Sequence, residues 1–150
     1  MEQMRDSQAA HGRGAGADGA GPVVVAVVED EALVLAGYQM LFESWGYQVV
    51  SGGSSDEVLD GLPEGRMAPD VIVADYRLRD GQNGVLVIRA LEEACRTSIP
   101  AIVITGDTSV ERLREVSASG LPIVHKPVNG LQLRGLLEQC LDQVREQGRA

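Results

Sequence analysis

Apolar residues follow two alternating patterns along this chain. Runs of about four to six residues rich in Val, Ile and Ala alternate with stretches of about nine to seventeen residues in which apolar positions recur at helical spacing. The predicted strands are Val23–Val28, Tyr47–Ser51, Val71–Ala74, Ala101–Thr105 and Ile123–His125. The predicted helices are Ala32–Trp45, a short helix beginning at Ser54–Glu57, Val85–Ala94, Val110–Ser119, and a last helix from after Pro127 to about Arg145. This alternation predicts an α/β fold.

The strand runs lack the polar alternation of a half-exposed sheet. Such runs are typical of parallel strands that helices cover on both faces. Helix ends support the boundaries: Gly46 is the expected stop for the first helix, Ser54 with Glu57 forms a capping box, and Asn129 with Gln132 forms a cap pair. We therefore expect a three-layer, doubly wound sheet of five parallel strands in the flavodoxin-like order 2-1-3-4-5.

Length and composition indicate one domain. The chain has 150 residues, 44% of them hydrophobic, which is enough for a single independent core. Residues 1–22 are rich in Gly and Ala without apolar periodicity, so we expect a flexible lead, a domain at 23–145 and a tail at 146–150. The longest unbroken apolar run, Val23–Val28, is far too short to cross a bilayer. These features predict a soluble, cytoplasmic protein that does not contact a membrane.

The charge of the chain argues against nucleic-acid binding. Its formal net charge is −9, and its 13 Lys and Arg residues are scattered rather than clustered along one surface. Aromatic residues make up only 3% of the chain, so few rings are available to stack on exposed bases. We expect no nucleic-acid partner and no DNA-binding output domain after the last helix.

Polar side chains of a particular kind stand at the ends of four predicted strands. Glu29 and Asp30 follow the first strand, and Asp75 follows the third. Thr105 ends the fourth strand and Lys126 follows the fifth. The carboxyl ends of parallel strands meet at one edge of a sheet, where ligands bind, and the first and third strands are neighbours in the expected order. We therefore expect these side chains to form one site.

These groups suit a divalent cation and a phosphoryl group. Packed carboxylates repel one another, and a bound Mg²⁺ removes that penalty because it takes oxygen ligands. An aspartate beside such an ion can attack phosphorus and form an acyl phosphate. Asp75 is the best-placed nucleophile, while Lys126 offers a cation and Thr105 a hydroxyl to phosphoryl oxygens. Gly106 leaves room for the group to enter.

The same residues carry a family resemblance. The acidic pair in VVEDE, the aspartate in VADYRL, the hydroxyl in VITGD and the lysine in HKPV resemble, in order and spacing, the motifs of the response-regulator receiver domain of two-component signalling, over about residues 23–144. The resemblance implies a phosphorelay module in which Asp75 accepts a phosphoryl group from a phosphohistidine. It implies a sensor histidine kinase or a histidine phosphotransfer protein as the partner.

The resemblance also implies the roles of individual residues. The metal site would consist of Glu29, Asp30, Asp75 and the backbone carbonyl of Arg77, with Mg²⁺ as the cofactor. Thr105 and Lys126 would act with Asp75 in phosphoryl transfer. The domain would catalyse its own phosphorylation and later hydrolysis without being an enzyme that turns over a substrate. Arg77 and Asp107 occupy positions where the family varies the rate of dephosphorylation.

Two departures from the family pattern affect these expectations. Many members have Met-Pro shortly after the phosphoacceptor, whereas this chain has Leu78-Arg79 and a loop one residue longer to Gly84. Many members carry an aromatic switch residue three positions before the lysine, where this chain has Ile123. We therefore expect a monomer or weak dimer, with the main partner surface near Ala32–Gly46. In the segments DYRL, GDT and HKPV, and in the absence of the aromatic residue, the chain resembles receivers fused to sensor histidine kinases.

The sequence also bears on the role of His125 and on three other functions. His125 could be a phosphodonor, but strand neighbours alternate faces, so we expect it to point away from Lys126 and pack against a helix or the core. A phosphatase of the haloacid-dehalogenase type would have its nucleophile on the first strand and an acidic residue in place of Arg77. A receiver-like scaffold that acts unphosphorylated would not need every chemical position filled. Nucleotide binding would call for GxxxxGK[ST] or GxGxxG after a strand, and neither is present.

Overall fold

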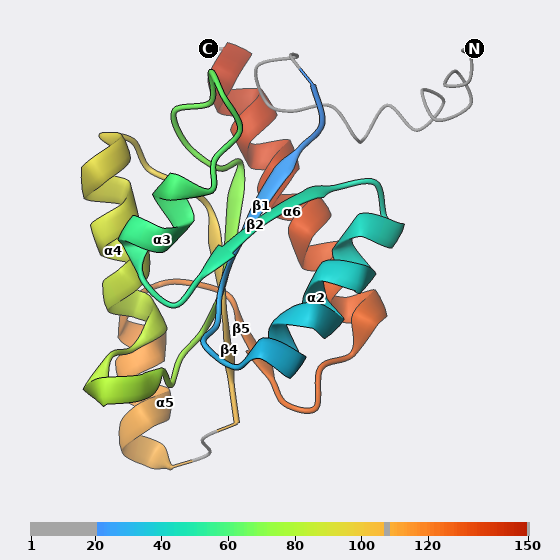
Figure 1. The fold of residues 1–150 in the computed structure, drawn as a ribbon. Coiled ribbons are helices and arrows are strands. Elements are labelled where there is room, and N and C mark those ends of the chain that lie inside the picture. The colour runs from blue at the N-terminus through green and yellow to red at the C-terminus, as the bar shows by residue number, and fades with distance from the viewer. Residues whose placement is uncertain (1–20, 107–108, 150) are drawn as a thin grey trace.

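The computed structural model describes residues 21–106 and 109–149. Every predicted strand and helix is present, and Figure 1 shows how they are arranged. In chain order the elements are β1 (Val24–Val28), α2 (Ala32–Ser44), β2 (Gln48–Gly52), α3 (Ser55–Asp60), β3 (Val71–Asp75), η2 (Arg79–Gly81), α4 (Gly84–Cys95), β4 (Ala101–Thr105), α5 (Val110–Ala118), β5 (Ile123–His125) and α6 (Gly130–Arg149). The 3-10 helix η2 was not expected, and α6 continues to Arg149 instead of ending near Arg145.

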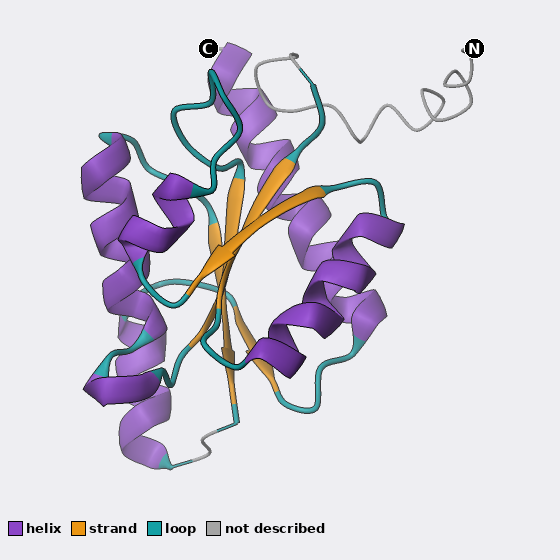
Figure 2. Ribbon diagram, in the orientation of Figure 1, coloured by secondary structure: helices purple, strands orange, loops and turns teal. Residues whose placement is uncertain are grey.

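The five strands form one parallel sheet in the order β2-β1-β3-β4-β5, which confirms the predicted fold class. Helices cover both faces: α2 and α6 lie on one side, and α3, α4 and α5 lie on the other (Figure 2). The register aligns the strand ends, since Val28 pairs with Ala74 and Asp75 pairs with Ile104. The carboxyl ends of β1, β3 and β4 therefore reach the same edge.

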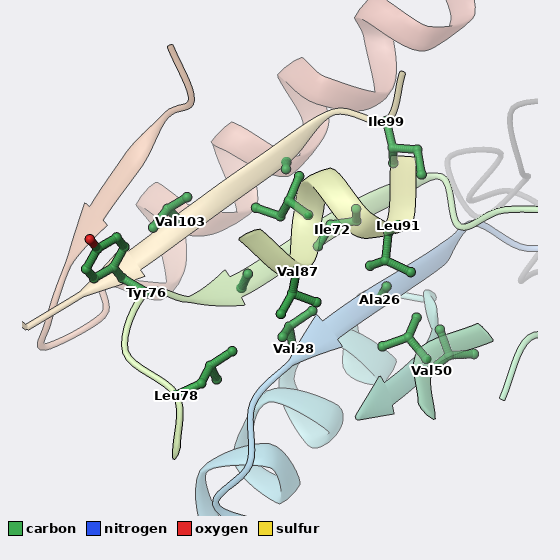
Figure 3. Close-up of a cluster of buried hydrophobic side chains, with 14 of the residues drawn as sticks. Ala26, Val28, Val50, Ile72, Tyr76, Leu78, Val87, Leu91, Ile99 and Val103 are labelled. Carbon is green, nitrogen blue, oxygen red and sulfur yellow. The ribbon is translucent and has the colours of Figure 1, made fainter. Parts of the chain in front are cut away.

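Two hydrophobic clusters hold the helices to the sheet. Residues of β1 alternate between them: Val24, Ala26 and Val28 belong to the cluster under α3, α4 and α5, while Val25 and Val27 belong to the cluster under α2 and α6. Figure 3 shows part of the first cluster. Because both faces of each central strand are buried, both sets of side chains must be apolar, and this explains the uninterrupted apolar runs in the sequence.

The predicted helix boundaries have the expected local causes. Ser54 Oγ accepts a hydrogen bond from the backbone N–H of Glu57 at 3.3 Å, and Glu57 Oε1 accepts one from the N–H of Gly53 at 2.7 Å. The Asn129 side chain accepts one from the N–H of Gln132 at 3.0 Å. Gly46 follows α2 with a φ of 91°, a conformation that glycine adopts without strain.

The placement of His125 corrects one expectation. Its side chain is exposed, not packed against a helix or the core. β5 is an edge strand of three residues, and His125 is its last residue, so the face alternation of an interior strand does not bury it. No helix in the described part of the chain is both long and apolar enough to span a membrane.

Gly84 allows α4 to begin directly beneath the end of β3. Its N–H donates to the Tyr76 carbonyl at 2.8 Å. A Cβ at this position would overlap the carbonyl oxygen of Asp75 and lie 3.0 Å from the Ala74 Cβ. The glycine is therefore required by the close approach of two backbones.

We predict that Gly84→Ala lowers the free energy of unfolding by about 1–3 kcal/mol, because the added methyl group forces the end of β3 and α4 apart. The matched control is Gly135→Ala in α6, where a Cβ would have no neighbour within 4 Å. That variant should be neutral or more stable by up to about 1 kcal/mol. Urea unfolding measures both, and equal effects from the two substitutions would contradict the explanation.

Candidate functional site

The predicted site residues meet at the carboxyl edge of the sheet. Asp75 is the last residue of β3 and Thr105 the last of β4, while Lys126 follows β5 directly. Glu29 and Asp30 follow β1, which pairs with β3. The structure therefore brings together side chains that are up to 97 residues apart in sequence, counting from Glu29 to Lys126.

Asp75 is held by donors on two sides. Its side chain is largely withdrawn from solvent, and the residue is 9% exposed. Lys126 Nζ lies 3.2 Å from Asp75 Oδ2 and forms an ion pair with it. The backbone N–H of Arg77 donates a longer hydrogen bond, 3.4 Å, to Oδ1. Both carboxylate oxygens thus have a donor, and the ammonium group offsets part of the buried negative charge.

Glu29 is a buried acid whose charge is poorly compensated. The residue is 2% exposed. Its Oε2 accepts hydrogen bonds from the backbone N–H groups of Asp30 and Glu31, each at 3.1 Å. Its Oε1 is buried without a hydrogen-bond partner. Burial, together with the neighbouring Asp75 carboxyl, raises the pKa of Glu29 to about 7, although the Glu31 backbone N–H and the Lys126 ammonium act in the opposite direction.

Asp30 has a partner that the sequence did not reveal. Its Oδ2 accepts a hydrogen bond from the backbone N–H of Arg79 at 2.6 Å, a short distance typical of a charge-assisted bond. Asp30, Glu29, Asp75 and Arg77 line a common cavity of about 240 Å³. The four residues expected to form a metal site therefore border one space.

The donors of this cavity fit Mg²⁺. The buried Glu29 Oε1 has no partner, which is the situation that a cation would relieve. Within residues 21–106 and 109–149, no three His, Cys, Asp or Glu side chains converge into a ligand cluster of their own. Mg²⁺ needs no such cluster, because it commonly takes one or two carboxylates and completes its octahedron with other oxygens and water.

Thr105 and Gly106 border the site on the side of β4. Thr105 is 2% exposed, and its carbonyl accepts a hydrogen bond from the backbone N–H of Lys126 at 2.9 Å. A Cβ at Gly106 would reach the Lys126 side chain at 3.5 Å, so Lys126 passes close to this residue. Asp107, a residue that the family resemblance singled out, lies outside the described residues.

The sequence patterns did not single out two tyrosines that lie near the site. Burial, with further contributions from the Asp75 and Glu29 carboxyls, raises the pKa of Tyr38 in α2 to about 12. Tyr76 follows Asp75, lies buried beneath α5, and donates a hydrogen bond from its hydroxyl to Glu115. In the sequence, the sign that Tyr76 lies near the site is its position next to Asp75. Its hydrogen-bond partner, Glu115, is 39 residues away in the chain and could not be predicted from a local pattern.

Comparison with known proteins agrees with this geometry. The family described as response regulator receiver domain matches residues 25–138. The chain belongs to this family. Receiver domains of response regulators are phosphoryl-accepting modules of two-component signal transduction. The strand order β2-β1-β3-β4-β5 found here is that of a receiver domain.

The curated relatives are much longer than this chain. The transcriptional regulatory protein ZraR of Salmonella typhimurium is 28% identical over 129 residues, which cover 85% of this chain and 28% of that protein. ZraR of Escherichia coli is 27% identical over 118 residues, which cover 78% of this chain and 26% of that protein. The chain thus spans little more than a quarter of these relatives' length.

Solved structures show the same fold. A response regulator receiver domain from Clostridium thermocellum superimposes with a TM-score of 0.68 at 21% identity, covering 81% of this chain and 95% of that one. The signal receiver domain of a modulated diguanylate cyclase from Desulfovibrio desulfuricans has a TM-score of 0.67 at 26% identity, covering 83% of this chain and 97% of that one.

The raised pKa of Glu29 predicts that the folding stability of the metal-free protein depends on pH. Because its folded-state pKa is above its ordinary value of 4.5, stability is highest below that value and falls as the pH rises toward about 7. Glu29→Gln should therefore be more stable than the unsubstituted protein by about 1–3 kcal/mol above pH 7, and the difference should vanish below about pH 4.5.

Urea unfolding in the presence of a chelator, repeated across this pH range, measures the effect. Glu31→Gln is the matched control, because Glu31 is exposed and its carboxyl can be hydrated in both states. A Glu29→Gln difference that stays constant with pH would show that the Glu29 charge is not the cause.

Proposed function

We propose that Asp75 accepts a phosphoryl group from a phosphohistidine of a sensor histidine kinase or a histidine phosphotransfer protein. The observation that carries the proposal is the setting of Asp75: a buried carboxylate at a strand end, 3.2 Å from the Lys126 ammonium and beside the unpartnered Glu29 Oε1. This arrangement concentrates negative charge around one nucleophile and leaves oxygen donors for a cation.

The transfer is an exchange of one bond to phosphorus for another. An Asp75 carboxylate oxygen bonds to phosphorus as the bond between phosphorus and the histidine nitrogen breaks, and the electron pair stays with the imidazole. Lys126, already paired with Asp75, neutralises charge on the phosphoryl oxygens, and the Thr105 hydroxyl donates a hydrogen bond to another of them. In the later hydrolysis a water oxygen bonds to phosphorus as the bond between the Asp75 oxygen and phosphorus breaks, which releases inorganic phosphate and restores the Asp75 carboxylate.

Glu29, Asp30, Asp75 and the Arg77 carbonyl would hold Mg²⁺ in the cavity that they line. When bound, the ion supplies positive charge that stabilises the transferring oxygens. The chain's own contribution is to keep these oxygens preorganised: the backbone N–H groups of Asp30 and Glu31 fix Glu29, and that of Arg79 contacts Asp30. The domain acts on itself, so we do not assign it the turnover of a separate substrate.

The proposed docking surface for the phosphodonor is the outer face of α2. Leu33 is 89% exposed and Met40 is 73% exposed, and Ala36 and Gly37 lie between them on the helix. This apolar stripe begins next to Glu29 and Asp30, so a helical domain seated on it would bring its phosphohistidine to Asp75. The net charge of −9 supports the absence of a nucleic-acid partner. A cytoplasmic location without membrane contact remains a prediction.

The first test is direct phosphorylation. Incubation with Mg²⁺ and acetyl phosphate should add one phosphoryl group, visible in the intact mass, and Asp75→Asn should abolish the addition because the amide is not a nucleophile. Asp70→Asn is a useful control, since Asp70 lies at the opposite end of β3, where it accepts a hydrogen bond from Val24. Undiminished labelling of the Asp75 variant would contradict the proposal.

The residue at position 123 predicts the oligomeric response. Ile123 packs against the cluster that contains Val103 and Val116, and it has no ring that could turn inward on phosphorylation. We expect the protein to remain a monomer or weak dimer when beryllofluoride and Mg²⁺ mimic the phosphorylated state. Sedimentation velocity at micromolar concentrations would show this, whereas a tight dimer formed through α5, β5 and α6 only with the mimic would contradict it.

A further inference from the structure

The loop after β3 is where this chain departs from the pattern of its family, and it forms a closed turn. The N–H of Leu78 donates to the Gln82 carbonyl, and the N–H of Gln82 donates to the Arg79 carbonyl, each at 3.1 Å. Arg77 and Asn83 form an antiparallel bridge across its base. Between them, η2 makes one 3-10 turn that ends at Gly81, whose φ is 74°. The extra residue of the loop is thus part of an ordered turn.

This turn directs one backbone N–H group to the metal cavity. Arg79 is the first residue of η2, a position whose N–H has no partner within the helix. That N–H donates to Asp30 Oδ2 at 2.6 Å. Arg79 stands where many receivers have the proline of Met-Pro, and proline has no N–H to donate. The replacement of that proline therefore creates a contact that the common pattern cannot make.

We propose that the backbone N–H of Arg79 is a positioning group that holds the Asp30 carboxylate ready for the divalent cation. The same arrangement occurs at Glu29, where two backbone N–H groups hold Oε2 while Oε1 has no partner. A fixed donor on one oxygen restricts the rotation of a carboxylate and leaves its second oxygen for a ligand bond. Loss of such outer contacts commonly weakens metal binding about 10- to 100-fold. The inference rests on the proposed function, because it presumes that Asp30 is a metal ligand.

Two substitutions of Arg79 distinguish the effect of its backbone N–H from the effect of its side chain. Arg79→Pro removes the N–H, and the site tolerates proline: Leu78 is extended, with φ −117° and ψ 171°, and the first position of a helical turn suits the fixed φ of proline. Arg79→Ala keeps the N–H and removes only the exposed guanidinium group. A difference between the variants therefore reports on the N–H.

Calorimetric titration of each protein with MgCl₂ gives the decisive comparison. We expect Arg79→Pro to bind Mg²⁺ about tenfold more weakly than the unsubstituted protein, and Arg79→Ala to bind within about twofold of it. Urea unfolding in chelator should place both variants close together, since a merely structural role would change stability without separating the two affinities. Equal or tighter Mg²⁺ binding by Arg79→Pro would overturn the inference.

A metal-free measurement examines the contact itself. Hydrogen exchange of the Arg79 amide should be slow in the unsubstituted protein and faster in Asp30→Ala, and an unchanged rate would also overturn the inference. Asp30→Asn distinguishes this failure from a failure of the proposed function. If Asp30→Asn weakens Mg²⁺ binding while Arg79→Pro does not, only the role of the N–H is wrong. If the unsubstituted protein binds no Mg²⁺ at millimolar concentrations, the proposed metal site is wrong, and this inference falls with it.

Discussion

Two carboxyl groups, Glu29 and Asp75, are packed next to each other at the edge of a sheet whose central strands are largely apolar, and the ammonium group of Lys126 lies beside them. Burial withdraws the Glu29 carboxyl from water, and the nearby Asp75 carboxyl adds repulsion, so the pKa of Glu29 rises to about 7. The fold tolerates this cost because the apolar residues of its central strands are buried in two clusters. A bound divalent cation would relieve that imbalance, which is the basis of the proposed metal site.

The parallel sheet determines where the site residues lie, and the loops provide hydrogen bonds to them. The aligned ends of β1 and β3 place Glu29, Asp30 and Asp75 around one cavity. Gly84 lets α4 approach β3 so closely that the loop between them must close over a short span. That loop contains the η2 turn, whose Arg79 N–H donates a hydrogen bond to Asp30. A change in this loop can therefore alter the proposed metal site while the sheet stays the same.

Much of this organisation could be predicted from the sequence because it depends on short-range patterns. Unbroken apolar runs located the strands, and the caps at Ser54 and Asn129 located helix starts, since both signals lie within a few residues. The family match confirmed the receiver assignment, which rested on the order of strand-end motifs. The roles of Asp75, Thr105 and Lys126 stay predictions, although the structure brings the three residues to one edge.

The remaining features depend on contacts that sequence patterns do not encode. The Arg79 N–H contacts a residue 49 positions away. Nearly every residue type has a backbone N–H, so the sequence does not indicate which of them makes such a contact. The hydrogen bond of Tyr76 to Glu115 is equally remote in sequence. His125 was placed wrongly because face alternation predicts burial only for an interior strand, and β5 proved to be a short edge strand. Tertiary context decided each of these cases.

The central claim is that the phosphoryl group is carried by the carboxylate of Asp75. Borohydride reduces an acyl phosphate to an alcohol, so it converts a phosphorylated aspartate to homoserine and marks the residue permanently. Reduction after treatment with Mg²⁺ and acetyl phosphate, followed by peptide mass mapping, reads the position directly. The account predicts homoserine in place of Asp75 and nowhere else. Homoserine in place of Asp30 or another acidic residue, or none at all in protein that carries phosphate, would contradict it.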